Sequence, residues 1–170
     1  LCVLRRITPA VDGSGIRSFL PGELPPADMP TDTYSSNNTH LNKMAVTLDL
    51  TMPEGSALAR RLIQIADVAL ENFRPGVMDK LGLGYSHLKE LRPDIIMISS
   101  SYAGSVGPES GYIGYADTFA ALGGLAHLTG YPDGPASEIR YPMDPLNATT
   151  GAVAIMLSLI HRQRTGEGQH

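Results

Sequence analysis

Short apolar segments alternate with helical patterns along residues 45–99. Residues 45–50 alternate apolar and polar positions, residues 67–70 form a second short run, and residues 95–99 are almost continuously apolar. Alternation is typical of a half-buried strand, whereas a continuous apolar run favours a strand buried on both faces of a parallel sheet. Strands that alternate with helices predict an α/β domain with a mostly parallel sheet.

Cap residues and apolar spacing predict the first helix directly after residue 50. Thr51 and Glu54 form a capping-box pattern, and Pro53 suits a first helical turn. The predicted apolar face of this helix consists of Leu58, Leu62, Ile65 and Ala66. A strand, a capped helix and a second strand follow one another here, as in an α/β unit.

Two short helices are predicted between the second and third apolar segments. Residues 77–81 form a helical turn that Gly82 closes, and Ser86 is the expected cap of a helix that ends at Leu91. The turn over 71–76 precedes the first of them. Arg92-Pro93 then ends the second helix before the strand at 95–99.

The second half of the chain is predicted to contain loops and two more helices. Residues 100–114 are rich in Gly and Ser and follow a strand, where ligand loops lie in open α/β sheets. A helix is expected over 118–128 and a turn over 129–135. The last helix should start at Asp144-Pro145 and end in a basic stretch before Gly166. Because it is apolar on most sides, we expect it to be buried.

Composition narrows the possible function classes. The 170 residues are 42% hydrophobic, which suffices for one globular domain, and 13 Lys and Arg face 17 Asp and Glu without a basic stripe for nucleic acid. No run approaches the length expected of a bilayer span. The single cysteine and scattered histidines predict no metal site. We therefore expect a cytoplasmic protein with neither a nucleic-acid nor a membrane partner.

The chain divides into an irregular segment over 1–40, rich in proline and glycine, and a partial domain over 41–170. The sequence starts at Leu1 without a methionine and stops at His170, where a further strand is expected. We interpret this as truncation at both ends.

Asp133 is the first candidate for chemistry, because it lies in the tight turn Pro132-Asp133-Gly134 after a helix. Such a turn can hold a carboxylate outside regular structure. The same sequence is also common in turns without any function. By the same reasoning Arg74 has a second interpretation as support for its own turn, and Tyr102 as part of the core.

Several motifs occur in the order of a known family. Leu41–Leu50 followed by Pro53-Glu54-Gly55 resembles the family III CoA-transferase stretch LNxNKRSVTLDLKTPEG, and Glu71–Gly76 matches the ENFRPG signature of that family. Residues 129–135 resemble its TGxxDGP turn, and residues 162–169 match a later block. The similarity covers about residues 41 to 169. Met44 departs from the pattern, since the family has a basic residue there.

The resemblance to this family, which includes formyl-CoA and carnitine-CoA transferases, implies a Rossmann-like large domain and an interlocked homodimer. It implies that Asp133 is the nucleophile that accepts the acyl group of an acyl-CoA. It also implies that the segment Asn72, Phe73 and Arg74 lies near coenzyme A, with Lys43 a weaker candidate and Tyr102 beside main-chain groups that position the acyl carbonyl. The expected partners are an acyl-CoA and a small organic acid. The piece alone is expected to be inactive and to expose the faces of its long last helix.

Two other functions remain open. The same superfamily contains 2-methylacyl-CoA racemases, which exchange an α-proton with a His and an Asp. Their His corresponds to Tyr115 here and their Asp to Asp144, while racemases usually lack the aspartate that corresponds to Asp133. A non-catalytic CoA-binding or dimerisation fragment is the third possibility.

Overall fold

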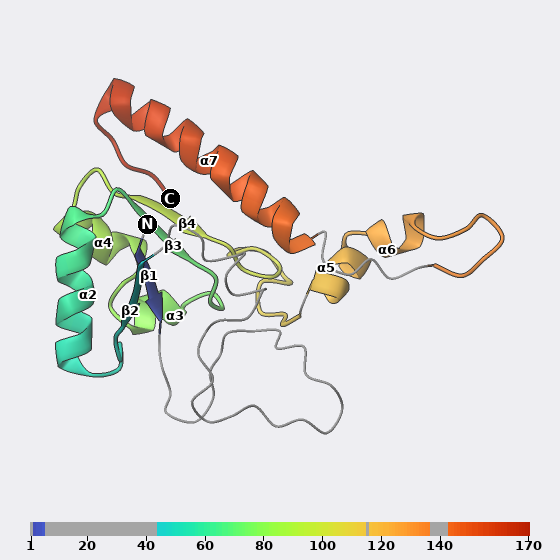
Figure 1. The fold of residues 1–170 in the computed structure, drawn as a ribbon, viewed down its shortest axis with the longest axis horizontal. Helices are drawn as coiled ribbons and strands as arrows, with labels where there is room; N and C mark the ends of the chain where they lie inside the picture. The colour runs from blue at the N-terminus through green and yellow to red at the C-terminus, as the bar shows by residue number, and fades with distance from the viewer. Residues whose placement is uncertain (1, 6–43, 115, 137–142) are drawn as a thin grey trace. The chain divides into compact units, whose positions relative to one another are not determined.

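A computed structural model describes residues 2–5, 44–114, 116–136 and 143–170 (Figure 1). The chain forms two compact units, Leu1–Ala59 and Arg60–His170, which are described separately below. The elements in chain order are β1 (Cys2–Arg5), β2 (Met44–Thr47), α2 (Pro53–Ile65), β3 (Val68–Glu71), α3 (Val77–Lys80), α4 (Tyr85–Leu91), β4 (Ile96–Ser99), α5 (Ala116–Leu122), α6 (Leu125–Leu128) and α7 (Met143–Thr165).

Both strand pairs are parallel, as the sequence predicts. In the first unit β1 pairs with β2, from Cys2 opposite Met44 to Arg5 opposite Thr47. In the second unit β3 pairs with β4, from Val68 opposite Ile96 to Glu71 opposite Ser99. The α/β class with a parallel sheet is therefore confirmed. The Rossmann-like topology stays a prediction, because the described residues form only two-stranded sheets.

In the first unit, strand β2 and the turn that follows it differ in detail from the prediction. The strand expected over 45–50 is shorter and ends at Thr47, and the capping box at Thr51 is wrong. The Asp49 carboxylate accepts hydrogen bonds from both the amide and the hydroxyl of Thr51, at 2.9 and 2.6 Å. The hydroxyl therefore serves the turn, and α2 begins at Pro53.

The N-terminal segment and the start of α2 add two findings. Cys2–Arg5 is a strand within the segment predicted as irregular, and residues 6–43 lie outside the described residues. A Cβ atom at Gly55 would collide with the main chain of Asp49, so this glycine allows α2 to approach the turn before it.

The buried side of α2 is shifted from the predicted one. Ala59 and Ile63, four residues apart, are buried, whereas Leu58 and Ile65 are exposed. Helical spacing fixes which residues share a face, but a helix with apolar residues on two sides leaves the choice of face to tertiary packing.

The core of the second unit lies at β4 and the helix before it. Leu88 of α4 and the consecutive residues Ile95, Ile96 and Met97 are almost fully buried, as is Leu83 in the turn before α4. Burial at Ile95, Ile96 and Met97 confirms a buried strand for the first part of residues 95–99, whereas Ile98 and Ser99 are half-buried.

Glycines set two helix boundaries that the sequence misplaces. Helix α4 starts at Tyr85 after Gly84, so Ser86 is not its cap, and a Cβ atom at Gly84 would collide with the Asp79 carboxylate. The single helix expected over 118–128 is instead α5 and α6. Gly124 separates them with a φ of 78°, a left-handed conformation that ends α5.

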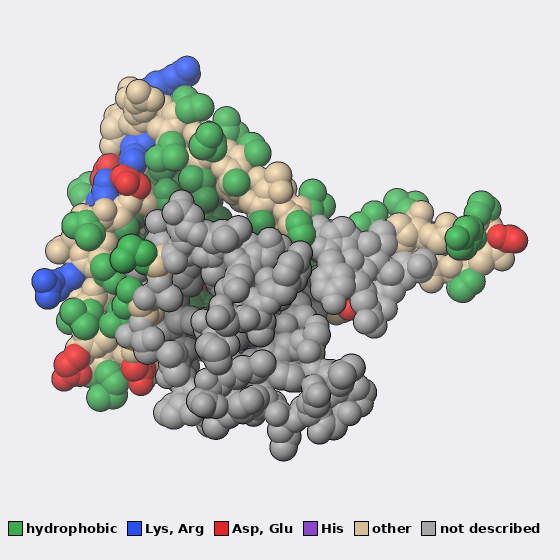
Figure 2. Space-filling view, viewed as in Figure 1, with side chains coloured by type: hydrophobic (Ala, Val, Ile, Leu, Met, Phe, Trp, Pro, Cys, Tyr) green, Lys and Arg blue, Asp and Glu red, His purple; other side chains and the backbone are tan. Residues whose placement is uncertain are grey.

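Helix α7 has the predicted length, but its side chains are not buried as predicted. It begins at Met143, one residue before the expected cap Asp144, and ends before Gly166, whose φ is 78°. No residue of α7 is buried, and large apolar side chains along it are exposed, as Figure 2 shows for one face. The expectation of a buried helix is therefore not met in this chain, whereas the expectation that the piece alone exposes the faces of this helix is confirmed.

By length and composition α7 also qualifies as a helix that can cross a bilayer, with a mean hydropathy of 1.3. This departs from the expectation that no such run is present. The helix is packed on one side against β4 and α5, and its last turn is held by ion pairs to loops of the same unit. Those contacts are what a helix of an α/β layer makes.

Helix α7 runs antiparallel to β4. Its Asn147 side chain contacts Ser100 after β4, and its Arg162 side chain contacts the main chain of Asp94 before β4. Asn147 to Arg162 spans about 22 Å of helix, and Asp94 to Ser100 spans about 20 Å of strand. Beyond Gly166 the chain turns back beside β4, where the Gln169 carbonyl accepts the Met97 amide at 2.9 Å.

Candidate active site

The loops that follow β3 and β4 start at the same edge of the sheet. Glu71 and Ser99, the last residues of the two strands, are register partners, and the Ser100 amide donates to the Glu71 carbonyl at 2.9 Å. Ligands in open α/β sheets bind beyond the carboxyl ends of parallel strands. The loop over 72–76 and the segment over 100–114 therefore flank the expected position of a ligand.

The loop after β3 is held in a defined conformation by its own residues. The Glu71 side chain accepts the Phe73 amide at 2.7 Å, and the Val77 amide donates to the Arg74 carbonyl at 3.1 Å. Gly76 has a φ of 80°, which favours glycine at the point where α3 starts.

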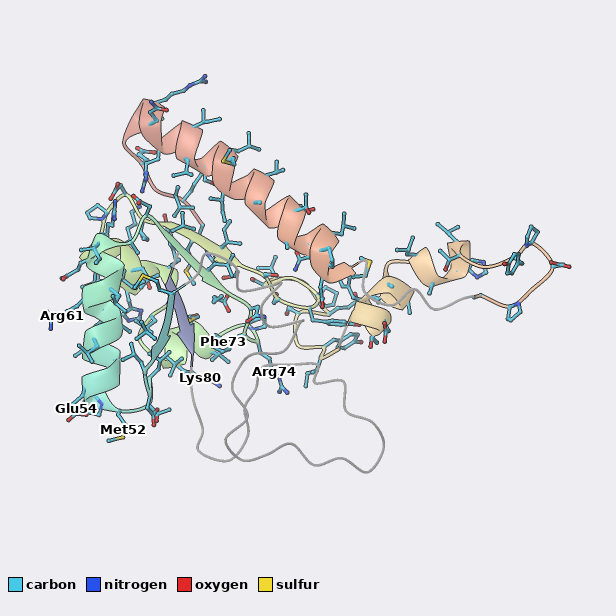
Figure 3. All side chains as sticks on the ribbon, viewed as in Figure 1. Met52, Glu54, Arg61, Phe73, Arg74 and Lys80 are labelled. Atoms are coloured by element: carbon cyan, nitrogen blue, oxygen red, sulfur yellow. The ribbon has the colours of Figure 1, made fainter. Side chains whose placement is uncertain are left out.

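The three predicted CoA-contacting side chains of this loop, Asn72, Phe73 and Arg74, are all exposed. Figure 3 labels Phe73 and Arg74 on the loop and Lys80 on α3. The exposed Arg74 side chain makes no ion pair with any described residue. The sequence interpretation of Arg74 as a support for its own turn applies to its carbonyl, not to its side chain.

Tyr102 lies in the loop after β4 and is half-buried. Its ring packs edge-on against Phe119 of α5, with the centroids 6.0 Å apart, and a Cβ atom at Gly114 would collide with that ring. Packing of this kind supports the interpretation of Tyr102 as a structural residue of the loop. A ligand contact by its hydroxyl stays a prediction.

Asp133 occupies a turn after α6, as predicted. The Gly134 amide donates to the Tyr131 carbonyl at 3.0 Å, which makes Pro132 and Asp133 the two central residues of a β-turn. The side chains from Tyr131 to Ala136 are exposed. The Asp133 carboxylate makes no hydrogen bond or ion pair with a residue in the described ranges, so it is accessible to a reactant.

The structure joins some predicted site residues and leaves others apart. Asn72, Phe73 and Arg74 share one loop, and Glu71 links that loop to the residues after β4. Within the described part of the chain, no hydrogen bond or ion pair connects the Asp133 turn to this loop. Lys43, and Tyr115 of the racemase alternative, lie outside the described residues. Asp144 is exposed in the first turn of α7.

Sequence reasoning missed Asn147 as a residue of this region. Its amide nitrogen donates to the Ser100 hydroxyl at 2.5 Å, across 47 positions of sequence. The available signal was a polar side chain near the start of a long helix whose middle part, residues 151–157, is apolar.

The opposite edge of the β3–β4 pair carries four ion pairs among the described residues. Arg92 contacts Asp67 at 2.9 Å and Asp94 at 3.0 Å, and Arg162 contacts Asp67 at 3.0 Å and Asp94 at 3.5 Å. The hydrogen bond with Arg92 lowers the pKa of Asp94 from its usual value, and the bond with Asp94 raises the pKa of Arg92. We define these four residues as the amino-edge network.

The described residues contain no group of three or more His, Cys, Asp or Glu that is suited to a metal ion. The exposed groups among the predicted site residues are the Asp133 carboxylate and the Arg74 guanidinium, and main-chain groups at the ends of the parallel strands lie beside the Arg74 loop. This combination fits an α/β protein that binds a phosphate-bearing ligand.

Comparisons with known proteins identify the family. The sequence profile described as CoA-transferase family III matches residues 8–170. Succinyl-CoA–D-citramalate CoA-transferase of Chloroflexus aurantiacus is 43% identical over 129 residues, 75% of this chain and 32% of that protein. The beta subunit of succinyl-CoA–L-malate CoA-transferase of the same organism is 37% identical over 164 residues, 94% of this chain and 39% of that subunit.

A solved structure agrees with this result. The orthorhombic crystal structure of Rv3272 from Mycobacterium tuberculosis superposes with a TM-score of 0.76 at 30% identity, covering 99% of this chain and 45% of that protein. The chain therefore belongs to CoA-transferase family III. It spans about a third of the length of the curated relatives that it matches.

Proposed function

We propose that the complete protein carrying this sequence transfers CoA from an acyl-CoA to a carboxylic acid, with Asp133 as the acyl-accepting carboxylate. The observation that carries the proposal is the exposed Asp133 side chain in its β-turn, without an ion pair among the described residues. A nucleophilic carboxylate has to be reachable by a thioester, and the TGxxDGP motif of the family contains an aspartate at this position.

The proposed reaction proceeds through two kinds of covalent intermediate on Asp133. A carboxylate oxygen attacks the thioester carbonyl of the donor, the C–S bond breaks, and CoA thiolate leaves from a mixed anhydride. The thiolate then attacks the aspartyl carbonyl, which releases the donor acid and leaves an aspartyl-CoA thioester. These two steps conserve the thioester bond energy.

The acceptor acid reverses the sequence. Its carboxylate attacks the aspartyl thioester and expels the thiolate, which gives a second mixed anhydride. The thiolate attacks the acceptor carbonyl of that anhydride, forms the new acyl-CoA and regenerates the free Asp133 carboxylate. Only a carboxylate fits this role, because it must become an activated acyl group and later leave as an acid.

We assign CoA binding to the loop after β3. The exposed Arg74 guanidinium suits a phosphate of CoA, since arginine offers several donors in a planar arrangement. Asn72 and Phe73 supply an amide and an aromatic ring beside it, and Lys43 and Tyr102 are weaker candidates for the same ligand. Succinyl-CoA is the first donor to test, because the names of both curated relatives include it.

Hydroxylamine trapping tests the covalent step. The complete protein is incubated with succinyl-CoA and hydroxylamine, digested, and analysed by mass spectrometry. We expect a hydroxamate at Asp133, and loss of CoA exchange by at least about a thousandfold in Asp133→Ala, since removal of a nucleophile eliminates the covalent route. Asp117→Ala, on α5, is the control. Full exchange activity in Asp133→Ala would refute the proposal.

The same protein distinguishes the two alternatives. Incorporation of deuterium at the α-carbon of a 2-methylacyl-CoA without a covalent adduct would support a racemase that uses Asp144. CoA binding with neither trapping nor exchange would support a non-catalytic binding protein. Transfer predicts trapping together with exchange.

We also propose a homodimer in the cytoplasm. The exposed apolar side chains of α7, among them Val153, Met156 and Leu157, support a surface that another part of the assembly covers. Light scattering of the purified complete protein should give the mass of a dimer, and the mass of a monomer would contradict the homodimer.

A further inference from the structure

Three hydrogen bonds connect Asn147, near the start of α7, to the loop after β3. The Asn147 amide donates to the Ser100 hydroxyl at 2.5 Å, the Ser100 backbone amide donates to the Glu71 carbonyl at 2.9 Å, and the Glu71 carboxylate accepts the Phe73 amide at 2.7 Å. We define these residues as the Glu71–Ser100–Asn147 chain. It joins a helix, the ends of two strands and a loop.

We propose that Glu71 is a positioning residue, which holds the Asn72–Arg74 loop in the conformation that binds CoA. The inference rests on the CoA-binding role assigned to that loop under the proposed function. Ser100 and Asn147 support Glu71 indirectly. The Ser100 amide binds the Glu71 carbonyl, and Asn147 holds Ser100 in place. None of these three residues is required to touch the reacting atoms.

The physical reason lies in the type of bond that Glu71 makes. A carboxylate that accepts a main-chain amide forms a charge-assisted hydrogen bond, stronger than a neutral one. This bond restrains the main chain between Glu71 and Phe73, and therefore the directions of the Asn72 and Arg74 side chains. A loop that is ordered before its ligand arrives loses less conformational entropy on binding, which raises affinity without a new contact.

A purely structural role for Glu71 makes a different prediction. If the bond only closes the turn after β3, its removal lowers the unfolding temperature and leaves the affinity for CoA unchanged. If the bond positions the loop, its removal weakens CoA binding in protein that is still folded. Affinity and thermal stability therefore have to be measured on the same samples.

The first experiment compares Glu71→Ala with Glu71→Gln in the complete protein. Calorimetric titration with free CoA should show about tenfold weaker binding for Glu71→Ala, and the KM for succinyl-CoA should rise by a similar factor while kcat stays within about twofold. Glutamine keeps a neutral acceptor at nearly the same place, so Glu71→Gln should recover most of the affinity. Glu90→Ala, an exposed glutamate of α4 without a partner among the described residues, is the matched control.

The second experiment tests Ser100 and Asn147 of the Glu71–Ser100–Asn147 chain. It stays informative if Glu71→Ala does not fold. Asn147→Ala and Ser100→Ala should each weaken CoA binding by about threefold, as expected for a neutral hydrogen bond. The double variant should be no weaker than either single one, because both substitutions remove the same interaction. Additive effects in the double variant would contradict a shared bond.

The outcomes separate this inference from the proposed function. If Asp133→Ala abolishes exchange while Glu71→Ala and Asn147→Ala bind CoA like the parent, the positioning role is wrong and the transferase stands. If Asp133→Ala retains exchange, the proposed function fails whatever Glu71 does. Weaker CoA binding in Glu71→Ala, recovery in Glu71→Gln and no change in Glu90→Ala together would support the inference.

Discussion

The two ends of the β3–β4 pair are built from different interactions. At the amino ends, Arg92 and Arg162 bridge Asp67 and Asp94 in the amino-edge network. At the carboxyl ends, the Glu71–Ser100–Asn147 chain leaves Asn72 and Arg74 exposed. At the amino ends the charged side chains form ion pairs with one another. At the carboxyl ends the charged Arg74 side chain is exposed.

Helix α7 takes part in both ends, which sharpens the comparison. Arg162 near its C-terminus belongs to the amino-edge network, and Asn147 near its N-terminus contacts Ser100. One helix antiparallel to β4 therefore fixes a structural edge and a candidate ligand edge. The difference teaches that substitutions at one edge should change stability, while substitutions at the other should change affinity for CoA.

The largest expected effect comes from the strand between the two edges. Ile96→Ala removes a side chain with no exposed surface and should cost about 2–5 kcal/mol of stability, because it leaves a cavity. The contacts at both ends of the β3–β4 pair should then be destabilised together. Leu70→Ala on β3 is the control, since Leu70 is 63% exposed and its loss should change stability by about 0.5 kcal/mol or less. Thermal unfolding measures both, and equal losses would contradict the burial pattern.

At the carboxyl edge, Arg74→Ala should raise the KM for succinyl-CoA about tenfold, the usual loss for a charged hydrogen bond to phosphate. The unfolding temperature should stay the same, because Arg74 contacts no acidic side chain in the described part of the chain. Arg61→Ala, an exposed cation on α2, serves as the control (Figure 3). A lower unfolding temperature without a change in KM would place Arg74 among the structural residues instead.

At the amino edge, Arg162→Ala should lower stability by about 1 kcal/mol, since partly exposed ion pairs contribute little individually. The KM for succinyl-CoA should not change. Arg164→Ala removes a nearby exposed arginine that has no partner among the described residues, and it should leave the unfolding temperature unchanged. If Arg162→Ala weakened CoA binding and left the unfolding temperature unchanged, the assignment of a purely structural role to the amino edge would be refuted.

The smallest effect concerns pH. The pKa of Asp94 is lowered in the folded state by its hydrogen bond with Arg92, so the folded protein prefers the ionised carboxylate more than the unfolded chain does. This contribution to stability is present above the unfolded pKa of about 4 and is lost as the pH falls through the lower folded pKa. Unfolding temperatures should therefore drop less steeply below about pH 4 in Asp94→Asn than in the parent. Parallel curves would show that Asp94 does not titrate differently on folding.

Much of the fold was predictable because the relevant signals are local. The β-branched and apolar run at 95–99 predicted β4, and the turn residues of 71–76 and 129–135 predicted both loops. Helix starts were less predictable. Thr51 and Ser86 are good caps in isolation, but Asp49 binds the Thr51 hydroxyl and the close approach of Asp79 to Gly84 sets the start of α4.

The candidate site divides in the same way. Motifs located Asp133 and the Asn72–Arg74 loop, since each lies within a few consecutive residues. The contact between Asn147 and Ser100 joins residues 47 positions apart, and no local pattern encodes such a distance. Glu71 is inside the motif, yet its bond to the Phe73 amide depends on a side-chain direction that the motif does not encode.

The sequence by itself determined the α/β class, most of the elements from Met44 to Ser99 and the turn that carries Asp133, because periodicity and turn chemistry act over a few neighbouring residues. Tertiary structure decided which face of α2 is buried, that α7 is exposed in this chain, and which polar groups meet at each edge of β3 and β4. Those outcomes depend on packing between segments far apart in the sequence, where several arrangements satisfy the same local pattern.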